Sequence, residues 1–128
     1  MTVRNYRSLK LVEGVPIGDI AVLVGRNDAG KSNFLYALDI FFNGGTIKDS
    51  DLTKGCSTAD QIEIEVLFSE LAPEVKKKLE SMHLLTRNSE LVVRKRFPGG
   101  QNSQTFPSMP TIMNDLTSRT FFPRKKKN

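Results

Sequence analysis

The chain has 128 residues, of which 38% are hydrophobic and 26% charged, so it is a globular protein of one domain or part of one. Its formal net charge is +5, but four of its nineteen basic residues form the run Arg124–Lys127, which leaves fifteen against fourteen acidic residues elsewhere. We interpret this run as a solvated tail. A basic nucleic-acid-binding protein is therefore the weakest of our three functional hypotheses.

Cysteine content and apolar runs indicate the compartment. Cys56 is the only cysteine, so no internal disulfide can form, which suits a reducing compartment. The first ten residues, MTVRNYRSLK, lack the apolar core of a signal peptide, and no apolar run is long enough to cross a bilayer. We therefore expect a cytoplasmic protein with no membrane partner.

The first third of the chain predicts a hairpin, a buried strand and a helix. Residues 3–11 and 12–17 have the pattern of two short strands, although Gly14 and Pro16 limit regular pairing in the second. The segment Ile20–Val24 is continuously apolar, which predicts a strand buried on both faces in the middle of a sheet. After it, apolar residues recur at the spacing of one helix face, namely Phe34, Leu35, Leu38, Phe41 and Phe42.

Gly44-Gly45 is expected to end this helix, and residues 46–60 are expected to form a polar loop. Beyond it, Ile62, Ile64, Val66 and Phe68 alternate with mostly polar residues, which predicts a strand with one wet face. Pro73 opens a helix whose predicted apolar face carries Val75, Leu79 and Met82.

Leu91–Phe97 is predicted as another strand, which Pro98-Gly99-Gly100 turns. From residue 98 onward we expect an irregular segment with a basic tail, because Pro107, Pro110 and Pro123 interrupt regular structure. Only Thr105-Phe106 and Phe121-Phe122 look able to pack there. The expected organisation is thus a lobe over residues 1–97 and an irregular segment over residues 98–128.

The segment Gly25–Ser32 fits the pattern G-x-x-x-x-G-K-[ST] of a phosphate-binding loop. Its two glycines permit backbone angles that turn successive N–H groups inward, at a helix N-terminus where the macrodipole favours negative charge. Lys31 is expected to reach the β- and γ-phosphates of ATP, and the Ser32 hydroxyl to ligate Mg²⁺. The predicted nucleotide-binding residues of this segment are Gly25, Asn27, Asp28, Ala29, Gly30, Lys31, Ser32 and Asn33.

Two segments carry a more specific resemblance: Asn27-Asp28-Ala29-Gly30-Lys31-Ser32-Asn33-Phe34-Leu35-Tyr36-Ala37-Leu38, and before it Arg4-Asn5-Tyr6-Arg7-Ser8-Leu9. Together they resemble the start of the ABC-type ATPase heads of the RecF, structural-maintenance-of-chromosomes and OLD (overcoming lysogenisation defect) families. The OLD branch, which includes the Gabija defence ATPase-nucleases, is the most similar. The resemblance implies an α/β fold, with part of a P-loop core joined to an antiparallel β lobe. It also implies that Arg7 and Ser8 line the nucleotide site.

Several parts that the resemblance implies are not encoded in these 128 residues. Such a head also uses a glutamine, a signature serine motif, an apolar strand ending in Asp-Glu, and a switch histidine. No run of four aliphatic residues followed by Asp-Glu occurs, and we predict no catalytic residue and no nuclease domain of the TOPRIM type. Asp39, Asp49 and Asp51 are expected in or just after the helix. We therefore expect ATP binding without hydrolysis by this chain alone.

Four other features have simpler interpretations. His83 is expected at a helix end on the surface, because no metal-ligand cluster accompanies it. Gln101 and Gln104 are expected in a loop, although either could be the family glutamine. Lys76–Lys78 and Arg94–Arg96 are interpreted as exposed charge, with DNA contact by Arg94–Arg96 in an assembled complex as the alternative.

Three hypotheses follow. In the first, the chain is the N-terminal lobe of an OLD-like ATPase, completed by a second lobe or a homologous chain, and DNA is a partner of the full assembly. In the second, it is a non-catalytic interaction module that pairs with an intact relative. The third is the nucleic-acid-binding protein that its basic tail suggests.

Overall fold

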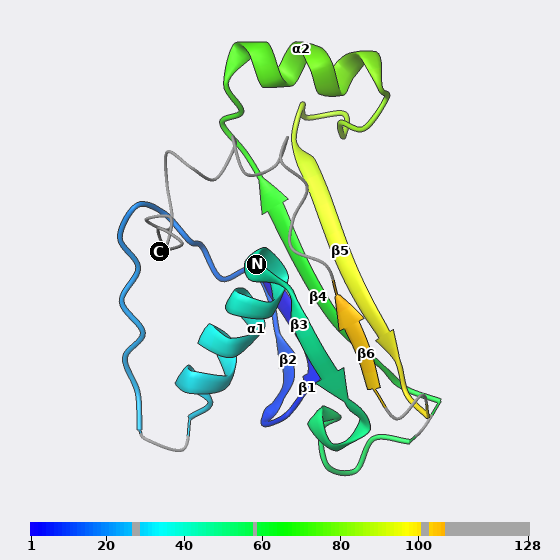
Figure 1. The fold of residues 1–128 in the computed structure, drawn as a ribbon. Helices are drawn as coiled ribbons and strands as arrows, with labels where there is room; N and C mark the ends of the chain where they lie inside the picture. The colour runs from blue at the N-terminus through cyan, green and yellow to red at the C-terminus, as the bar shows by residue number, and fades with distance from the viewer. Residues whose placement is uncertain (27–28, 58, 101–102, 107–128) are drawn as a thin grey trace, which may run out of the picture.

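The computed structural model describes residues 1–26, 29–57, 59–100 and 103–106. A four-stranded antiparallel sheet, in the order β2-β1-β4-β5, forms its largest layer, and a separate pair joins β3 to β6 (Figure 1). The strands are β1 (Thr2–Tyr6), β2 (Leu9–Val12), β3 (Gly45–Lys48), β4 (Gln61–Phe68), β5 (Leu91–Pro98) and β6 (Ser103–Phe106). The helices are α1 (Lys31–Asn43), the 3₁₀ turn η1 (Asp49–Asp51) and α2 (Pro73–Ser81).

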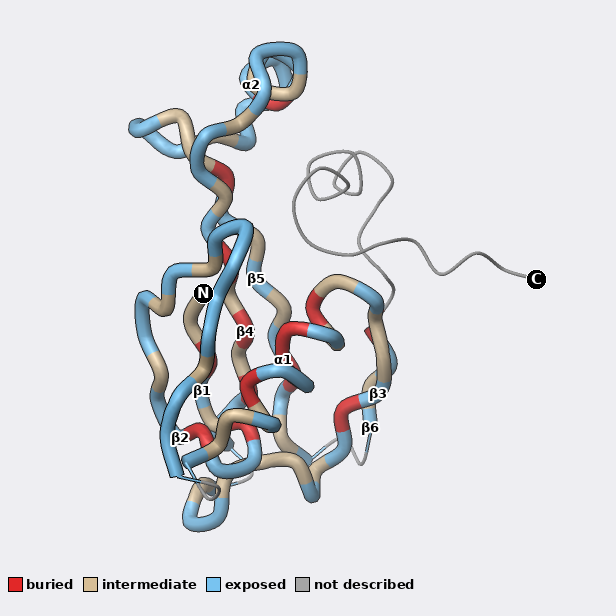
Figure 2. Tube along the Cα trace, turned by 90° about the vertical axis from the view of Figure 1, so that its left-hand side faces the viewer, coloured by how far each residue is buried: buried red, intermediate tan, exposed pale blue. Residues whose placement is uncertain are grey.

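The core lies between the four-stranded sheet and α1, as the buried residues in Figure 2 show. Alternation along β4 sends Ile62, Ile64 and Val66 to the α1 side, where Phe34 and Phe41 meet them. These residues are all buried, at most 7% exposed. The period-2 and helical patterns of the sequence therefore produce the two faces that build this layer.

The outer face of the sheet carries ion pairs between β1, β4 and β5. Arg94 pairs with Glu65, and Arg96 Nε lies 2.8 Å from Glu63 Oε2 on the neighbouring strand. Arg4 of β1 also approaches Glu63, at 3.7 Å. One wet face for the strand at residues 61–68 is thus confirmed.

The α2 helix stands away from this core, on the arm between β4 and β5 (Figure 1). Pro73 opens it as predicted, and Leu79 is its buried residue. Met82 was expected on the same face but is 51% exposed, because the helix ends at Ser81 and the chain turns away. In α1 the corresponding exception is Leu35, which is 55% exposed, while Gly44 ends the helix as expected with φ 78°.

A hairpin is present at the N-terminus, but both of its strands lie largely within the predicted first strand, and the second strand predicted at residues 12–17 is wrong beyond Val12. Tyr6 pairs with Leu9, so the turn falls at Arg7 and Ser8 rather than near Val12. Arg7 adopts a φ of 51°, which reverses the chain within two residues. The second strand then ends at Val12, before Gly14.

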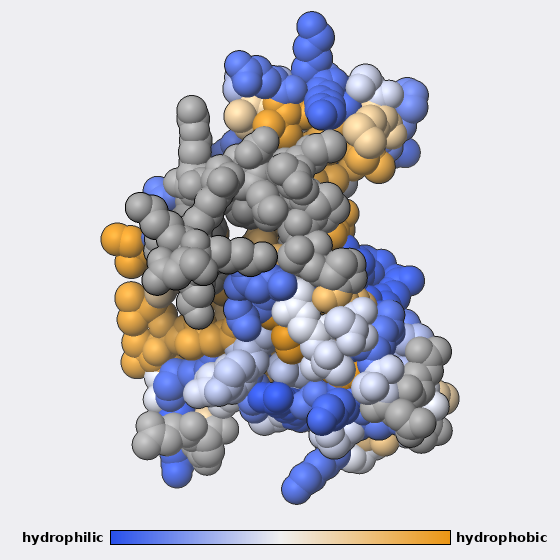
Figure 3. Space-filling view, viewed as in Figure 1, coloured by the Kyte–Doolittle hydropathy of each residue, from blue (hydrophilic) through white to orange (hydrophobic). Residues whose placement is uncertain are grey.

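The expectation of a buried central strand at Ile20–Val24 is wrong. These residues form no strand, and Ile20, Val22 and Val24 are 88%, 77% and 89% exposed. The segment runs along the outside of α1, where no strand of the described residues pairs with it, and the apolar surface at that edge is visible in Figure 3. Apolar composition favours burial, but a strand also needs neighbouring backbone for its N–H and C=O groups.

Residues 46–60 were expected to be a polar loop, and this is also partly wrong. They include most of β3, whose Ile47 is 1% exposed, and the turn η1. Ile47 is buried within the core cluster, and its strand pairs with β6, which carries the buried Phe106. β6 lies in the segment expected to be irregular, and residues 107–128 lie outside the described residues.

Candidate nucleotide site

The glycine-lysine-serine segment lies at the N-terminus of α1, the position that phosphate binding needs. Gly30 is the N-cap, with a left-handed φ of 84°, and the helix begins at Lys31. Ala29 N–H donates to Arg26 C=O at 3.1 Å, which tightens the end of the loop. Asn27 and Asp28 lie outside the described residues, so the geometry of the middle of the loop is not described.

The side chain of Lys31 turns back over this loop. Its ammonium Nζ donates hydrogen bonds to the carbonyl oxygens of Gly25 and Arg26. The positive charge therefore lies within the loop rather than along the helix. Ser32, the predicted Mg²⁺ ligand, is exposed in the first turn of α1.

Gly30 is required for space as well as for its backbone angle. A Cβ at this position would lie 2.7 Å from Leu9 Cδ2 and 2.8 Å from Ser8 Oγ, closer than real Cβ contacts. The turn of the first hairpin is thus packed directly against the end of the loop. This contact brings residues 8 and 9 to a site that the sequence places more than twenty positions later.

Side-chain hydrogen bonds join the same turn to the first turn of α1. Asn33 Nδ2 donates to Ser8 Oγ at 2.8 Å, and Arg7 Nη1 reaches Asn33 Oδ1 at 3.5 Å. The structure therefore brings Arg7 and Ser8 together with Gly30 and Asn33. Whether Arg7 and Ser8 contact nucleotide stays a prediction, as does the role of every loop residue.

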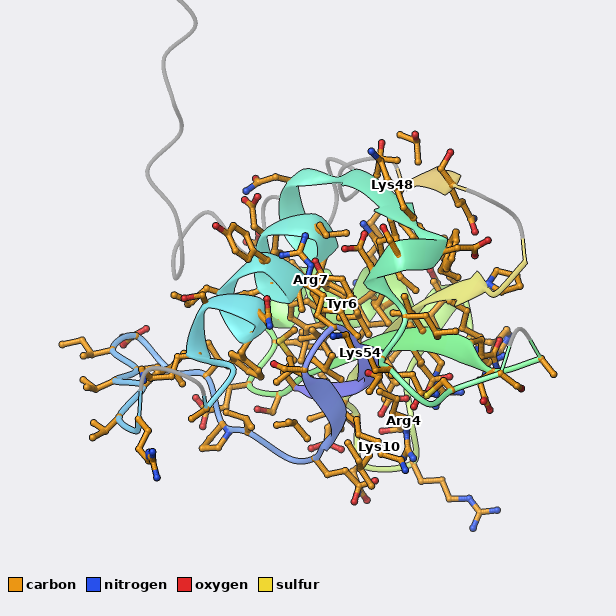
Figure 4. All side chains as sticks on the ribbon, turned by 90° about the horizontal axis from the view of Figure 1, so that it is seen from below. Arg4, Tyr6, Arg7, Lys10, Lys48 and Lys54 are labelled. Atoms are coloured by element: carbon orange, nitrogen blue, oxygen red, sulfur yellow. The ribbon has the colours of Figure 1, made fainter. Side chains whose placement is uncertain are left out.

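Arg7 is held on several sides. Its Nε donates to Asp51 Oδ1 at 2.9 Å, and its backbone N–H donates to Asp51 C=O at 2.6 Å. The guanidinium carbon lies 5.1 Å from the centre of the Tyr6 ring and 5.0 Å from that of Tyr36, within cation–π range. Figure 4 shows Tyr6 and Arg7 side by side against α1.

This cluster has perturbed electrostatics. Burial raises the pKa of Tyr6, with Arg7 opposing the shift, and the Tyr6 hydroxyl is buried with no hydrogen-bond partner. Burial tends to lower the pKa of Arg7, but its hydrogen bond to Asp51 and its nearness to Tyr6 outweigh that and raise it. Arg7 is therefore a permanent cation.

Sequence reasoning found Arg7 and Ser8 but not Tyr6, Tyr36 and Asp51. Tyr36 follows Asn33 by one helical turn, so it could have been placed on the same face. No pattern in the sequence links Asp51 to Arg7, since 44 positions separate them.

The residues at the start of α1 fit the phosphates of a nucleotide with Mg²⁺. No side chain caps the N-terminus of the helix, and its first turn contains no acidic residue, so its N–H groups and Lys31 form a positive site. When bound, Mg-ATP would meet Lys31 through its phosphates and Ser32 through its metal. Within the described residues, no group of three or more His, Cys, Asp or Glu side chains forms a separate metal site.

The remaining predicted features lie elsewhere. His83 is exposed at φ 55° just after α2, in agreement with a helix-end residue, and Gln101 lies outside the described residues. Gln104 lies in β6 rather than in a loop, and its Oε1 is buried without a partner. Lys95 points to the α1 side, where its Nζ donates to Ile40 C=O at 3.2 Å.

Residues 1–108 match the model of the AAA ATPase domain. The chain belongs to that family. Membership implies a nucleotide ligand, typically bound with Mg²⁺, and the mixed α/β architecture with an antiparallel sheet is consistent with it. Neither helix among the described residues has the length and apolar character needed to cross a bilayer.

Three curated relatives each match less than half of this chain. An uncharacterized protein of Methanocaldococcus jannaschii is 56% identical over 41 residues, which is 32% of this chain and 12% of that protein. The DNA replication and repair proteins RecF of Rickettsia prowazekii and Rickettsia typhi are 35% and 36% identical over 60 and 58 residues, 47% and 44% of this chain. These stretches are 17% and 15% of the RecF proteins, so the chain matches less than a fifth of each relative. No solved structure matches.

Proposed function

We propose that this chain binds Mg-ATP through the segment Gly25–Asn33, with Arg7 and Ser8 beside it, as the N-terminal lobe of an OLD-like ATPase. The observation that carries the proposal is the contact at Gly30. This left-handed glycine joins the phosphate-binding segment to α1 and leaves no space for a Cβ against Ser8 and Leu9. A glycine with a left-handed φ at a helix N-terminus is expected where a loop turns its backbone N–H groups toward an anion.

The charges near the loop support the same ligand. Lys31 places its ammonium on the loop, and the guanidinium of Arg7 lies beside Asn33 and Tyr36 of α1. An anion of several negative charges, such as the triphosphate of ATP, is the ligand that this arrangement suits.

Hydrolysis, in this proposal, needs groups that another lobe or another chain supplies. Phosphoryl transfer to water requires a positioned nucleophile and charge stabilisation in addition to a phosphate cradle. The exposed Ile20, Val22 and Val24 support completion by further protein, because three large apolar side chains in water favour burial. In the full assembly the substrate would be DNA, as the resemblance to OLD nucleases implies.

The exposed apolar residues also favour the second hypothesis, a module that pairs with an intact ATPase relative without acting itself. The two differ in whether nucleotide binding and turnover depend on Lys31 of this chain. In the first, adding a complementary lobe gives turnover that Lys31→Ala abolishes. In the second, the wild-type chain and Lys31→Ala change the ATP turnover of the intact relative by the same amount.

The experiment is a calorimetric titration of the chain with Mg-ATP, and the same titration of Lys31→Ala. We expect weak binding by the wild type and none by the variant, because a lone lobe contacts the phosphates but encloses little of the base. Lys77→Ala, which removes an exposed lysine of α2, is the matched control and should bind as the wild type does. Equal heats for the wild type and Lys31→Ala would overturn the proposal.

A phosphate-release assay tests the proposal that this chain alone does not hydrolyse ATP. The purified chain with Mg-ATP should show no turnover that depends on Lys31. Loss of water positioning and charge stabilisation removes several orders of magnitude in rate, by analogy with the roughly 10³- to 10⁵-fold effect of an arginine finger. Lys31-dependent turnover at ordinary enzymatic rates would show that these residues contain a catalytic base.

A further inference from the structure

We infer that Asp51 is a positioning residue for the nucleotide site, which holds the guanidinium of Arg7 at the first turns of α1. This inference rests on the proposed binding of Mg-ATP next to that turn. It concerns a residue that does not touch the ligand and acts through Arg7.

The geometry of the Asp51–Arg7 pair distinguishes it from a chance surface ion pair. Asp51 makes two contacts with the same residue, one from Oδ1 to Nε at 2.9 Å and one from its C=O to the Arg7 backbone N–H at 2.6 Å. Its second oxygen, Oδ2, accepts a hydrogen bond from the Lys48 backbone N–H at 3.0 Å. The carboxylate is therefore fixed at both oxygens, and its side chain is only 15% exposed.

The choice of nitrogen also matters. Because Asp51 occupies Nε, the two terminal nitrogens of the guanidinium stay directed away from it, and Nη1 reaches Asn33 on α1. A guanidinium has five N–H donors, so this arrangement leaves donors available to an anion at the start of the helix. Asp51 thus orients the cation without occupying the edge that faces α1.

Two aromatic rings complete the support. Tyr6 and Tyr36 each lie about 5 Å from the guanidinium carbon, and they come from different elements, β1 and α1. Arg7 itself lies in the turn of the hairpin with a positive φ of 51°, so the pairing of β1 with β2 fixes its backbone. A residue held in this way by a strand, a helix and a 3₁₀ turn is preorganised for a defined contact.

Simple electrostatics and positioning predict opposite effects when the charge of Asp51 is removed. The triphosphate is strongly negative, so loss of a nearby carboxylate would tighten binding if Asp51 acted only through its charge. If Asp51 orients Arg7, the same change weakens binding. The sign of the effect therefore decides between the two roles.

The test measures Mg-ATP affinity for Asp51→Ala and Asp51→Asn, each also combined with Arg7→Ala. We expect Asp51→Ala to weaken binding about tenfold, on the scale of one charge-assisted hydrogen bond. Asp51→Asn should weaken it less, because its amide oxygen still accepts from Nε. In the Arg7→Ala background neither change should have an effect, since the group through which Asp51 acts is gone. Asp39→Ala, an exposed carboxylate farther along α1, is the matched control and should leave affinity unchanged.

Tyrosine fluorescence supplies a second readout that a loss of stability alone would not produce. The chain contains two tyrosines and no tryptophan, and both tyrosines flank Arg7, so its intrinsic emission reports on this cluster. Magnesium tripolyphosphate, which lacks a light-absorbing base, should change that emission in the wild type, and about tenfold more of it should be needed for the same change in Asp51→Ala.

The outcomes separate the two claims. If the wild type shows no Lys31-dependent binding, the proposed function fails and the role of Asp51 fails with it. If binding is present but Asp51→Ala tightens it, leaves it unchanged, or weakens it equally in the Arg7→Ala background, the positioning role alone is overturned.

Discussion

Asn33 Nδ2 donates a hydrogen bond to Ser8 Oγ across 2.8 Å, and this bond ties the turn of the first hairpin to the first turn of α1. The same two segments meet at Gly30, where Ser8 and Leu9 occupy the space of a Cβ. The phosphate-binding segment is therefore supported by residues that come first in the chain. Its geometry should depend on them.

Ser8→Ala tests that dependence. The change removes the acceptor of Asn33, so we expect a modest loss in the free energy of unfolding, about 0.5 kcal/mol for an exposed bond, and weaker Mg-ATP binding. Urea denaturation and titration calorimetry measure the two effects. Ser81→Ala, which removes a hydroxyl bonded to Lys78 C=O in α2, should affect stability comparably but leave affinity unchanged. Equal Mg-ATP affinities for the wild type, Ser8→Ala and Ser81→Ala would show that Ser8 does not contribute to the site.

A series of glycine substitutions separates backbone strain from crowding. Gly18→Ala should be neutral, because the residue has no positive φ and no atom lies within 4 Å of the position that a Cβ would take. Gly55→Ala should cost about 1 kcal/mol, since its φ is +88° in open space. Gly30→Ala adds contacts of 2.7 and 2.8 Å to a φ of +84°, so we expect about 3 kcal/mol or more, together with loss of Mg-ATP binding. Thermal denaturation ranks the three variants, and a Gly30→Ala protein as stable as Gly18→Ala would contradict the close packing.

Elements that depend on local sequence patterns were predicted correctly, and elements that depend on contacts between distant residues were not. The strands at Ile62–Phe68 and Leu91–Phe97, and the helix after Lys31, were predicted because their apolar periodicity is local. β3 was missed because its burial rests largely on Ile47 and on pairing with β6, more than fifty positions away. Strand pairing between distant segments leaves no periodic signal in either one.

The candidate site also has a part that the sequence pattern predicts and a part that only the fold brings together. The loop is a contiguous motif whose glycines, lysine and serine have physical roles that can be named from the sequence. Asp51 belongs to the cluster only through tertiary contact with Arg7, whereas Tyr6 directly precedes Arg7 in the sequence and could have been included with it. The segment Ile20–Val24 was predicted wrongly because its apolar character reports a preference for burial, whereas strand formation depends on which backbone lies beside it.

Tyr6→Phe is expected to leave stability unchanged or to increase it. The Tyr6 hydroxyl is buried without a hydrogen-bond partner, so its removal relieves a desolvation cost and leaves the ring contacts in place. The midpoint of urea denaturation measures this. A loss of more than about 1 kcal/mol would mean that the hydroxyl has a partner in solution.

The same variant tests the pH dependence that Tyr6 contributes. Burial raises its pKa above 10.0, so in alkaline solution the folded state keeps a proton that the unfolded state has released. The stabilisation from this group is complete below pH 10.0 and declines as the pH rises through the folded-state pKa. Burial lowers the pKa of Lys95, so the contribution of Lys95 to stability rises with pH as its ammonium loses its proton. Both proteins contain Lys95. The quantity to measure is therefore the difference in the free energy of unfolding between the wild type and Tyr6→Phe. That difference should shift in favour of Tyr6→Phe as the pH rises above 10.0; a difference constant with pH would contradict the raised pKa of Tyr6.

The segment before the phosphate-binding loop provides a last prediction, because one of its side chains contacts the core while its neighbours are exposed. Leu23 packs against the core cluster, while Ile20, Val22 and Val24 are exposed. The triple variant Ile20→Thr, Val22→Thr, Val24→Thr should therefore change the free energy of unfolding by no more than about 0.5 kcal/mol for each position. Leu23→Thr, the matched control within the same segment, should destabilise the fold by more than any one of them. The triple variant should also bind less of a dye for apolar surface and self-associate less, since a polar side chain removes the gain from covering these positions. If the triple variant unfolds far more easily than Leu23→Thr, the three side chains are buried in solution, and the strand expected from the sequence at Ile20–Val24 forms there after all.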